Sequence, residues 1–260
     1  MMRVRRLVLR PRLCSTFERA DGSPIDITPS LCSGGVGGAA SSAFASRWET
    51  IFAQKKQTRR VTEIFSTWAD DNRDEQMHMN HASAVETIVA PPLAELAGRD
   101  GTAGFRFLDA GCGNGWLVRS MAAREGCAAA IGLDGSEAMV AKARALSSST
   151  PAAEFFHSPM EEWSPSMPFD FVFSMEVLYY QRDPSRLLSH MRTWLKPNGV
   201  FAAGLDFFEE HEASHAWPVK TGLPMTLLSA KQWRSALQDA GFRDATVERV
   251  DNTLALHARR

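Results

Sequence analysis

The chain of 260 residues is long enough for one large α/β domain with an extension, and 44% hydrophobic and 23% charged residues are typical of a globular protein. No stretch reaches the roughly 18 consecutive apolar residues that a membrane-spanning helix needs, so we expect no membrane span. The first 45 residues hold six arginines and three acids, so the rest carries a net charge of −4, which argues against nucleic acid as a partner.

Residues 1–45 have the composition of a targeting segment. "MMRVRRLVLRPRLCSTF" contains five arginines and no acid, and residues 27–48 are acid-free and rich in Ser, Gly and Ala. Such a composition predicts a mitochondrial or plastid leader, whereas a secretory signal would need an apolar segment of about 7–15 residues. A disordered basic tail on a cytoplasmic protein is the alternative.

The next part of the chain, residues 46–100, is expected to form a helical cover. Two capping-box patterns, Ser46–Glu49 and Ser83–Glu86, each predict the start of a helix. The pair Pro91–Pro92 is expected to break the second helix.

Residues 101–260 alternate between strand and helix patterns. Apolar runs predict strands at 105–110, 128–134, 153–156, 169–175 and 197–207. Helices are expected at 114–124, 136–144, 184–195 and 230–241, and a closing hairpin at 245–250 and 253–258. This order predicts a doubly wound, Rossmann-like α/β sheet that is mostly parallel, with one antiparallel strand near the C-terminus.

A glycine-rich loop follows the first strand of that domain in "LDAGCGNGW". Gly111, Gly113 and Gly115 let the backbone approach a ligand, and Asp109 precedes them. The dinucleotide fingerprint G-x-G-x-x-G would place its third glycine at position 116, which is Trp116. An acid before the loop suits an amino group better than a pyrophosphate, and Asp134, after the next strand, can hold ribose hydroxyls.

Four ordered motifs resemble those of class I S-adenosylmethionine-dependent methyltransferases of the small-molecule branch. They are "LDAGCGNG", "IGLDGSEAMVAKAR", "FDFVFSMEVLYY" and "LLSHMRTWLKPNGVFAAG", and the resemblance covers roughly residues 60–250. It implies that S-adenosylmethionine is the cofactor and that a methyl group passes to a small-molecule acceptor by in-line displacement. The chain departs from the family at Pro159, where an adenine-binding Asp is common.

The resemblance also implies a set of cofactor contacts, with Asp109 and the loop at the amino-acid end and Asp134 at the ribose. The residues are Asp109, Gly111, Cys112, Gly113, Asn114, Gly115, Asp134, Gly135, Met139, Met160, Glu161, Ser174 and Met175.

The acceptor is expected beside Tyr179 and Tyr180, which follow the fourth strand, and beside His215 in the loop after the fifth. Glu176 is expected to be a solvent-facing or helix-capping acid. Trp68, Met77 and His78 lie in the segment where the family places a cover over the cofactor.

No metal site is predicted. His78 and His81 lack a third ligand and fit an amphipathic helix face, while His211 and His215 fit a solvated polar loop. The four cysteines (Cys14, Cys32, Cys112 and Cys127) show no C-x-x-C spacing and are expected to be reduced.

Three other functions compete with this hypothesis. A ubiquinone-pathway O-methyltransferase would need Glu and His where Tyr179 and Tyr180 stand, because phenols do not replace those metal ligands. An NAD oxidoreductase is disfavoured by Asp109 and Trp116. A non-catalytic methyltransferase-fold assembly protein would bind the cofactor without turnover. The sequence indicates no oligomeric state.

Overall fold

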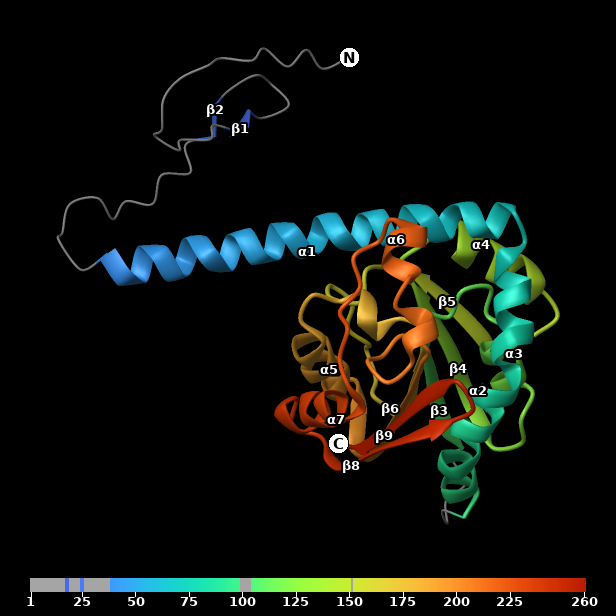
Figure 1. Cartoon of the computed structure of the whole chain (residues 1–260). Coiled ribbons are helices and arrows are strands. Elements are labelled where there is room, and N and C mark those ends of the chain that lie inside the picture. The colour runs from blue at the N-terminus through green and yellow to red at the C-terminus, as the bar shows by residue number, and fades with distance from the viewer. Residues whose placement is uncertain (1–16, 19–23, 26–37, 99–103, 151) are drawn as a thin grey trace. The chain divides into compact units, whose positions relative to one another are not determined.

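The computed structural model describes residues 17–18, 24–25, 38–98, 104–150 and 152–260, with side chains from residue 53 onward (Figure 1). The chain divides into two compact units, Met1–Trp48 and Glu49–Arg260. The first contains the two-residue strands β1 (Phe17–Glu18) and β2 (Pro24–Ile25) and the beginning of α1 (Gly38–Asp70). Most of the predicted leader lies outside the described residues.

The second unit is built on a seven-stranded sheet with the order β5-β4-β3-β6-β7-β9-β8. The strands are β3 (Phe105–Ala110), β4 (Cys127–Asp134), β5 (Ala153–His157), β6 (Phe169–Met175), β7 (Leu195–Leu205), β8 (Arg243–Val250) and β9 (Thr253–Arg259). Only β9 runs against its neighbours among these strands. The predicted fold class is therefore confirmed, including the single antiparallel strand near the C-terminus.

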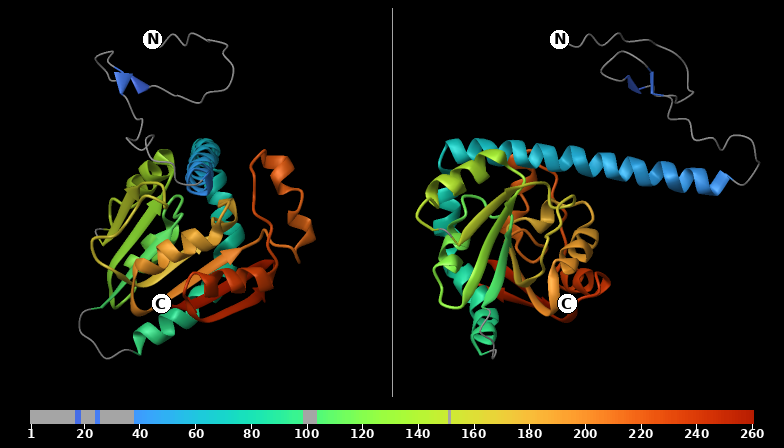
Figure 2. Two further views of the ribbon diagram at one scale, coloured as in Figure 1. Left: turned by 90° about the vertical axis from the view of Figure 1, so that its left-hand side faces the viewer. Right: turned by 180° about the vertical axis from the view of Figure 1, so that it is seen from behind.

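Helices cover both faces of this sheet (Figure 2). They are α2 (Arg73–Ala97), α3 (Trp116–Ala122), α4 (Glu137–Leu146), α5 (Pro184–Thr193), α6 (Trp217–Thr221) and α7 (Ala230–Asp239), with the short 3-10 turns η1 (Leu178–Tyr180) and η2 (Glu212–Ser214). No helix within the described ranges is both long and apolar enough to span a membrane.

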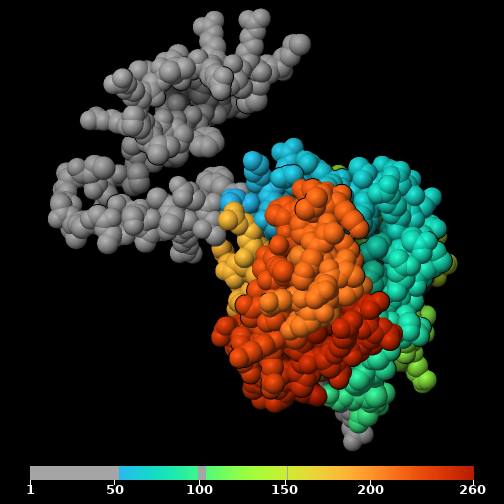
Figure 3. All heavy atoms as spheres, viewed as in Figure 1, coloured from blue at the N-terminus to red at the C-terminus, as the bar shows by residue number. Residues whose placement is uncertain are grey.

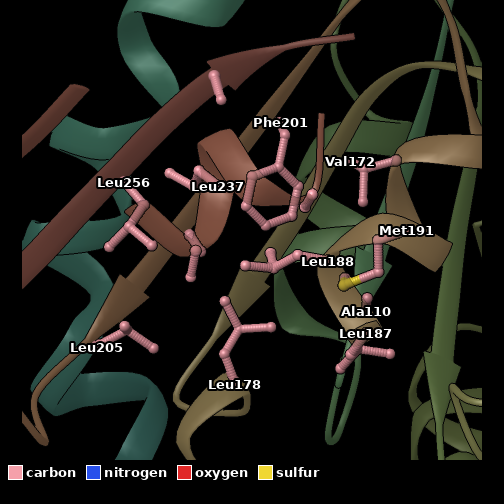
Figure 4. Close-up of a cluster of buried hydrophobic side chains, with 14 of the residues drawn as sticks. Ala110, Val172, Leu178, Leu187, Leu188, Met191, Phe201, Leu205, Leu237 and Leu256 are labelled. Carbon is pink, nitrogen blue, oxygen red and sulfur yellow. The ribbon is translucent and has the colours of Figure 1, made fainter. Parts of the chain in front are cut away.

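Successive strand residues point to opposite faces and form two separate cores. On one face, Phe107 and Phe171 pack with residues of α2, α3 and α4. On the other, Leu108 and Val172 pack with residues of α5 and α7, as the close-up of Leu187, Leu188 and Leu237 shows (Figure 4). Because both faces are buried, the strands are continuous apolar runs, which is why their sequences predicted them to within about two residues.

The two N-terminal capping boxes were predicted wrongly. Ser46–Glu49 lies inside the 33-residue helix α1, and Ser83–Glu86 lies inside α2. By contrast, Ser229 does form a capping box with Gln232 at the start of α7, and the Asp183 side chain caps α5. A Ser-x-x-Glu pattern fits a helix start only where the preceding chain is not itself helical.

Pro91 and Pro92 do not break α2, contrary to the prediction. Proline lacks an N–H, so Pro92 cannot donate to the carbonyl of Ile88 four residues earlier. His257 of β9 supplies the missing donor, because its Nε2 lies 2.8 Å from the Ile88 carbonyl oxygen. A tertiary contact thus replaces a lost helical hydrogen bond.

Replacing His257 with Ala is expected to lower the free energy of unfolding by about 1–3 kcal/mol, because the buried Ile88 carbonyl loses its donor. Chemical denaturation measures this loss. In a Pro92→Ala background the restored N–H reaches the same carbonyl, so the cost of His257→Ala should shrink. Equal costs in both backgrounds would contradict this account of α2.

Candidate functional site

A cavity opens at the carboxyl ends of β3, β4 and β6, where doubly wound sheets bind their ligands. The loop residues Gly111 to Asn114 line it, together with Asp109 of β3 and Asp134 of β4. The helices α1 and α2 close it from the other side with Thr58, Val61, Thr62, Phe65, Trp68, Asp74, Met77, His78 and His81. The cavity therefore lies between the sheet edge and the two N-terminal helices.

Asp134 fixes the shape of the glycine loop. One carboxylate oxygen accepts the Gly113 N–H at 2.9 Å, and the other accepts the Ser136 N–H at 2.8 Å. Burial raises the pKa of Asp134, while the backbone N–H donors lower it. The acid expected to bind a ribose thus also ties the loop after β3 to the start of α4.

Gly113 and Gly115 have different tasks in that loop. A Cβ on Gly113, whose φ is 52°, would meet nothing within 4 Å, so this position is open toward the cavity. A Cβ on Gly115, whose φ is 75°, would lie 2.4 Å from Cε1 of Phe155. Gly115 is not a lining residue; it lets the loop close against β5.

Asp109 is buried at the bottom of the cavity. Desolvation by burial, together with the nearby charge of Asp134, raises its pKa to about 8. A buried carboxyl group in this state is stabilised in its charged form by a cation. The two carboxyl groups and the glycine loop fit an S-adenosyl cofactor, because its ammonium group can supply that positive charge to Asp109.

The other predicted cofactor residues divide into two groups. Lining positions are held by Gly111, Cys112, Asn114, Gly135, Met139, Met160, Glu161 and Met175. Ser174 is fully buried behind the wall, where its Oγ donates to the Ala110 carbonyl oxygen at 2.7 Å. Pro159, the departure from the family pattern, also lines the cavity.

Of the predicted acceptor residues, only Tyr180 lines the cavity. Tyr179 is buried beside it, and its hydroxyl donates to Glu176 at 2.8 Å. His215 lies outside the lining set on an exposed turn, where its Nε2 donates to the Glu209 carbonyl oxygen at 3.0 Å. The segment that carries His215 lies against α1, as the Arg60 contact with the Gly222 carbonyl indicates (Figure 3).

Helix α2 is bonded to the glycine loop. Asp74 accepts from Asn114 Nδ2 at 2.7 Å and from Lys142 Nζ at 2.9 Å. The His78 ring stacks on Trp116, with 4.2 Å between the ring centroids and 17° between the planes. Sequence reasoning missed Asp74, although its spacing of four from His78 and seven from His81 places all three on one helix face.

A second polar group lies at the cavity wall and joins three elements. His81 of α2 and Glu176 at the end of β6 line the cavity, and Asp206 follows β7. His81 Nε2 is 3.2 Å from Asp206 Oδ2, and Asp206 N–H donates to Glu176 Oε1 at 2.5 Å. The expectation that Glu176 faces solvent or caps a helix is wrong, because Glu176 is only 7% exposed.

Comparison with known proteins gives one matching family model, described as a methyltransferase domain, over residues 64–247. The tRNA U34 carboxymethyltransferase of Idiomarina loihiensis is 32% identical over 182 residues, 66% of this chain and 54% of that protein. The malonyl-[acyl-carrier protein] O-methyltransferase of Halalkalibacterium halodurans is 28% identical over 54% of this chain and 56% of that protein. The chain thus spans about half the length of these curated relatives.

Among solved structures, a chain of the Haloferax volcanii complex between the Trm112 methyltransferase activator and a methyltransferase is similar with a TM-score of 0.64. It is 27% identical, and the match covers 75% of this chain and 96% of that chain. Magnesium protoporphyrin IX methyltransferase from Synechocystis, with 20% identity and a TM-score of 0.52, shares the fold.

Replacing Asp134 with Asn is expected to weaken binding of S-adenosylhomocysteine by about 1–3 kcal/mol, since a charged acceptor of Gly113 and of the ligand is lost. Calorimetric titration measures the affinity. Glu137→Gln, three residues further on at an exposed position of α4, is the matched control and should bind as the unaltered chain does. Unchanged binding in a folded Asp134→Asn variant would contradict the assignment.

Proposed function

Because this chain belongs to the methyltransferase domain family and has the fold of S-adenosylmethionine-dependent class I methyltransferases, we propose that it methylates a small-molecule acceptor. The observation that carries the proposal is the cavity in which Asp109, the glycine loop and Asp134 meet α1 and α2. In this proposal residues 46–100 form the cover and residues 101–260 the cofactor-binding domain.

The cofactor would be held at three places by this chain's own groups. Asp109 would meet the ammonium group, Asp134 the ribose hydroxyls, and Met139 and Met160 the adenine. The cofactor supplies an activated methyl group, so the protein's main tasks are to orient the acceptor and to exclude water. Phe65, Trp68 and Met77, which line the cavity from α1 and α2, support the second task.

A small acceptor is supported by how the cavity is closed. Gln57 of α1 donates to the Tyr180 carbonyl oxygen at 2.5 Å, and Asp74 of α2 bonds to Asn114 in the loop. These bonds hold both helices across the cavity, which suits a compact acceptor better than a folded RNA. The tRNA U34 carboxymethyltransferase among the relatives nevertheless makes tRNA the alternative acceptor to test.

The test is methyl transfer from tritiated S-adenosylmethionine to a cell extract separated into small molecules, RNA and protein. The expected result is label in the small-molecule fraction, lost when Asp109 is replaced by Asn. Label in RNA would contradict the small-molecule proposal. Binding of the cofactor without label in any fraction would favour a non-catalytic binding or assembly protein.

A further inference from the structure

Resting on the proposed function, we infer that the acceptor is a non-anionic molecule bearing a hydroxyl or amine and that Glu176 is the general base that removes its proton. Neither the acceptor's charge nor a base follows from the family's shared fold. Two separate observations carry the inference: the charges on the cavity wall and the surroundings of Glu176.

The cavity wall is acidic and aromatic. None of the described residues that line the cavity is a lysine or an arginine. By contrast, the acids Asp109, Asp134 and Glu176 all line it. Two basic side chains contact lining residues from outside the wall: Lys142 pairs with Asp74, and Arg119 donates to the Asn114 carbonyl oxygen at 2.6 Å. A carboxylate or phosphate acceptor would therefore face Asp109, Asp134 and Glu176 with no lysine or arginine on the wall to pair with.

Apolar and aromatic side chains make up much of the cavity wall. Phe65 and Tyr180 meet edge to face with 5.6 Å between their ring centroids, and Phe65 also packs against Trp68 at 4.9 Å. Met77 and Val177 also line the cavity. Such a surface suits an acceptor with an apolar or aromatic body, and the ring faces favour a cation over an anion.

Glu176 is held in position by its neighbours. Its backbone has a φ of 59°, a conformation that costs energy for a residue with a side chain, and its N–H donates to the Gly204 carbonyl oxygen at 2.9 Å. The Tyr179 hydroxyl and the Asp206 N–H each donate to one carboxylate oxygen. Each oxygen keeps a further lone pair, so the fixed carboxylate can still accept a proton from a ligand in the cavity.

His81 is poorly placed to be the base itself. Its Nδ1 donates to the Met77 carbonyl oxygen at 2.8 Å, and its Nε2 contacts Asp206, so both ring nitrogens are engaged. Burial lowers its pKa, but the bond to Asp206 and the charge of Glu176 outweigh burial and raise it. The contact between His81 Nε2 and Asp206 fixes Asp206, whose N–H in turn positions Glu176.

The charged and titratable groups around Glu176 set its proton affinity. Burial, followed by the charge of Asp206, raises the pKa of Glu176 to about 7, while His81 and the hydrogen bond from Tyr179 lower it. Tyr180, the remaining titratable neighbour, is neutral near pH 7 because burial raises its pKa above the ordinary value for a phenol. A carboxylate that gains and loses a proton near neutral pH is well matched to general-base catalysis.

The acceptor's O–H or N–H bond breaks and its proton goes to a Glu176 carboxylate oxygen. The electron pair left on the acceptor atom forms the new bond to the methyl carbon. The carbon–sulfur bond breaks, and its electron pair goes to sulfur, which neutralises the sulfonium. The products are the methylated acceptor, S-adenosylhomocysteine and a neutral Glu176.

The test uses the full chain, tritiated S-adenosylmethionine and two matched sets of compounds. One set holds neutral phenols and alkyl and aryl amines, including tyramine. The other holds their carboxylate counterparts, including para-hydroxyphenylacetate, with malonate and trans-aconitate. Turnover is expected in the first set only, and Glu176→Gln should lower kcat/KM at least about 100-fold. Glu209→Gln, at an exposed position after β7, is the matched control and should leave turnover unchanged.

Two further readouts separate a base from a structural residue. The kcat/KM should fall as the pH drops through about 7, because Glu176 must be ionised to accept a proton. Asp206→Asn should move that midpoint to lower pH, since the charge of Asp206 raises the pKa of Glu176. Infrared titration without any acceptor should show a carboxylic acid band near neutral pH that is missing in Glu176→Gln.

Three results would overturn the inference: turnover of the carboxylate set, turnover by Glu176→Gln within threefold of the unaltered chain, or no turnover of either set although S-adenosylhomocysteine binds. Failure of the proposed function has a different signature, because no label from S-adenosylmethionine would then enter the small-molecule fraction of the cell extract. Glu176→Gln should itself bind S-adenosylhomocysteine as the unaltered chain does, which excludes misfolding as the cause of lost turnover.

Discussion

The partly buried carboxylate of Asp134 is the group on which the geometry of the site depends. It stands at the end of β4 and holds the N–H groups of Gly113 and Ser136, so one side chain fixes both the loop after β3 and the start of α4. Because Asp109 lies beside that loop, its burial and raised pKa also depend on this arrangement. Holding two carboxyl groups in a desolvated cavity costs free energy. A bound cationic ligand offsets this cost.

Helix α2 connects the two halves of the cavity. At one end Asp74 bonds to Asn114 of the glycine loop, and one turn later His78 stacks on Trp116. Further along, His81 bonds to Asp206 beside Glu176. The helix that shields the cofactor site thus also carries a residue that positions the proposed base, which links exclusion of water to proton transfer.

The sequence predicts the sheet well, because each buried strand is a continuous apolar run and residues typical of turns and helix caps separate the strands. It predicts the N-terminal helices less well. Ser83–Glu86 looks like a helix start, and Pro91–Pro92 looks like a helix end, but both lie within α2. The Ile88 carbonyl, which Pro92 leaves without a donor, is satisfied by His257, 169 residues further on, and no local pattern encodes that contact.

The site shows the same division between local and distant information. The Asp109 loop is one contiguous motif, so its lining positions follow from the sequence. The group of His81, Glu176 and Asp206 comes from three distant segments. Each of these residues alone fits an ordinary helix face, cap or loop. Only the packing of α2 against the ends of β6 and β7 brings them together.

Calorimetric titration with S-adenosylhomocysteine at pH 7, in two buffers of different ionisation enthalpy and alongside NAD, tests the central claim most directly. A cationic ammonium group that meets Asp109 must find it ionised, although its pKa is about 8. We expect S-adenosylhomocysteine to bind with release of nearly one proton and NAD not to bind. Asp109→Asn should abolish the proton release. Binding of NAD, or binding of S-adenosylhomocysteine without proton release, would contradict the central claim.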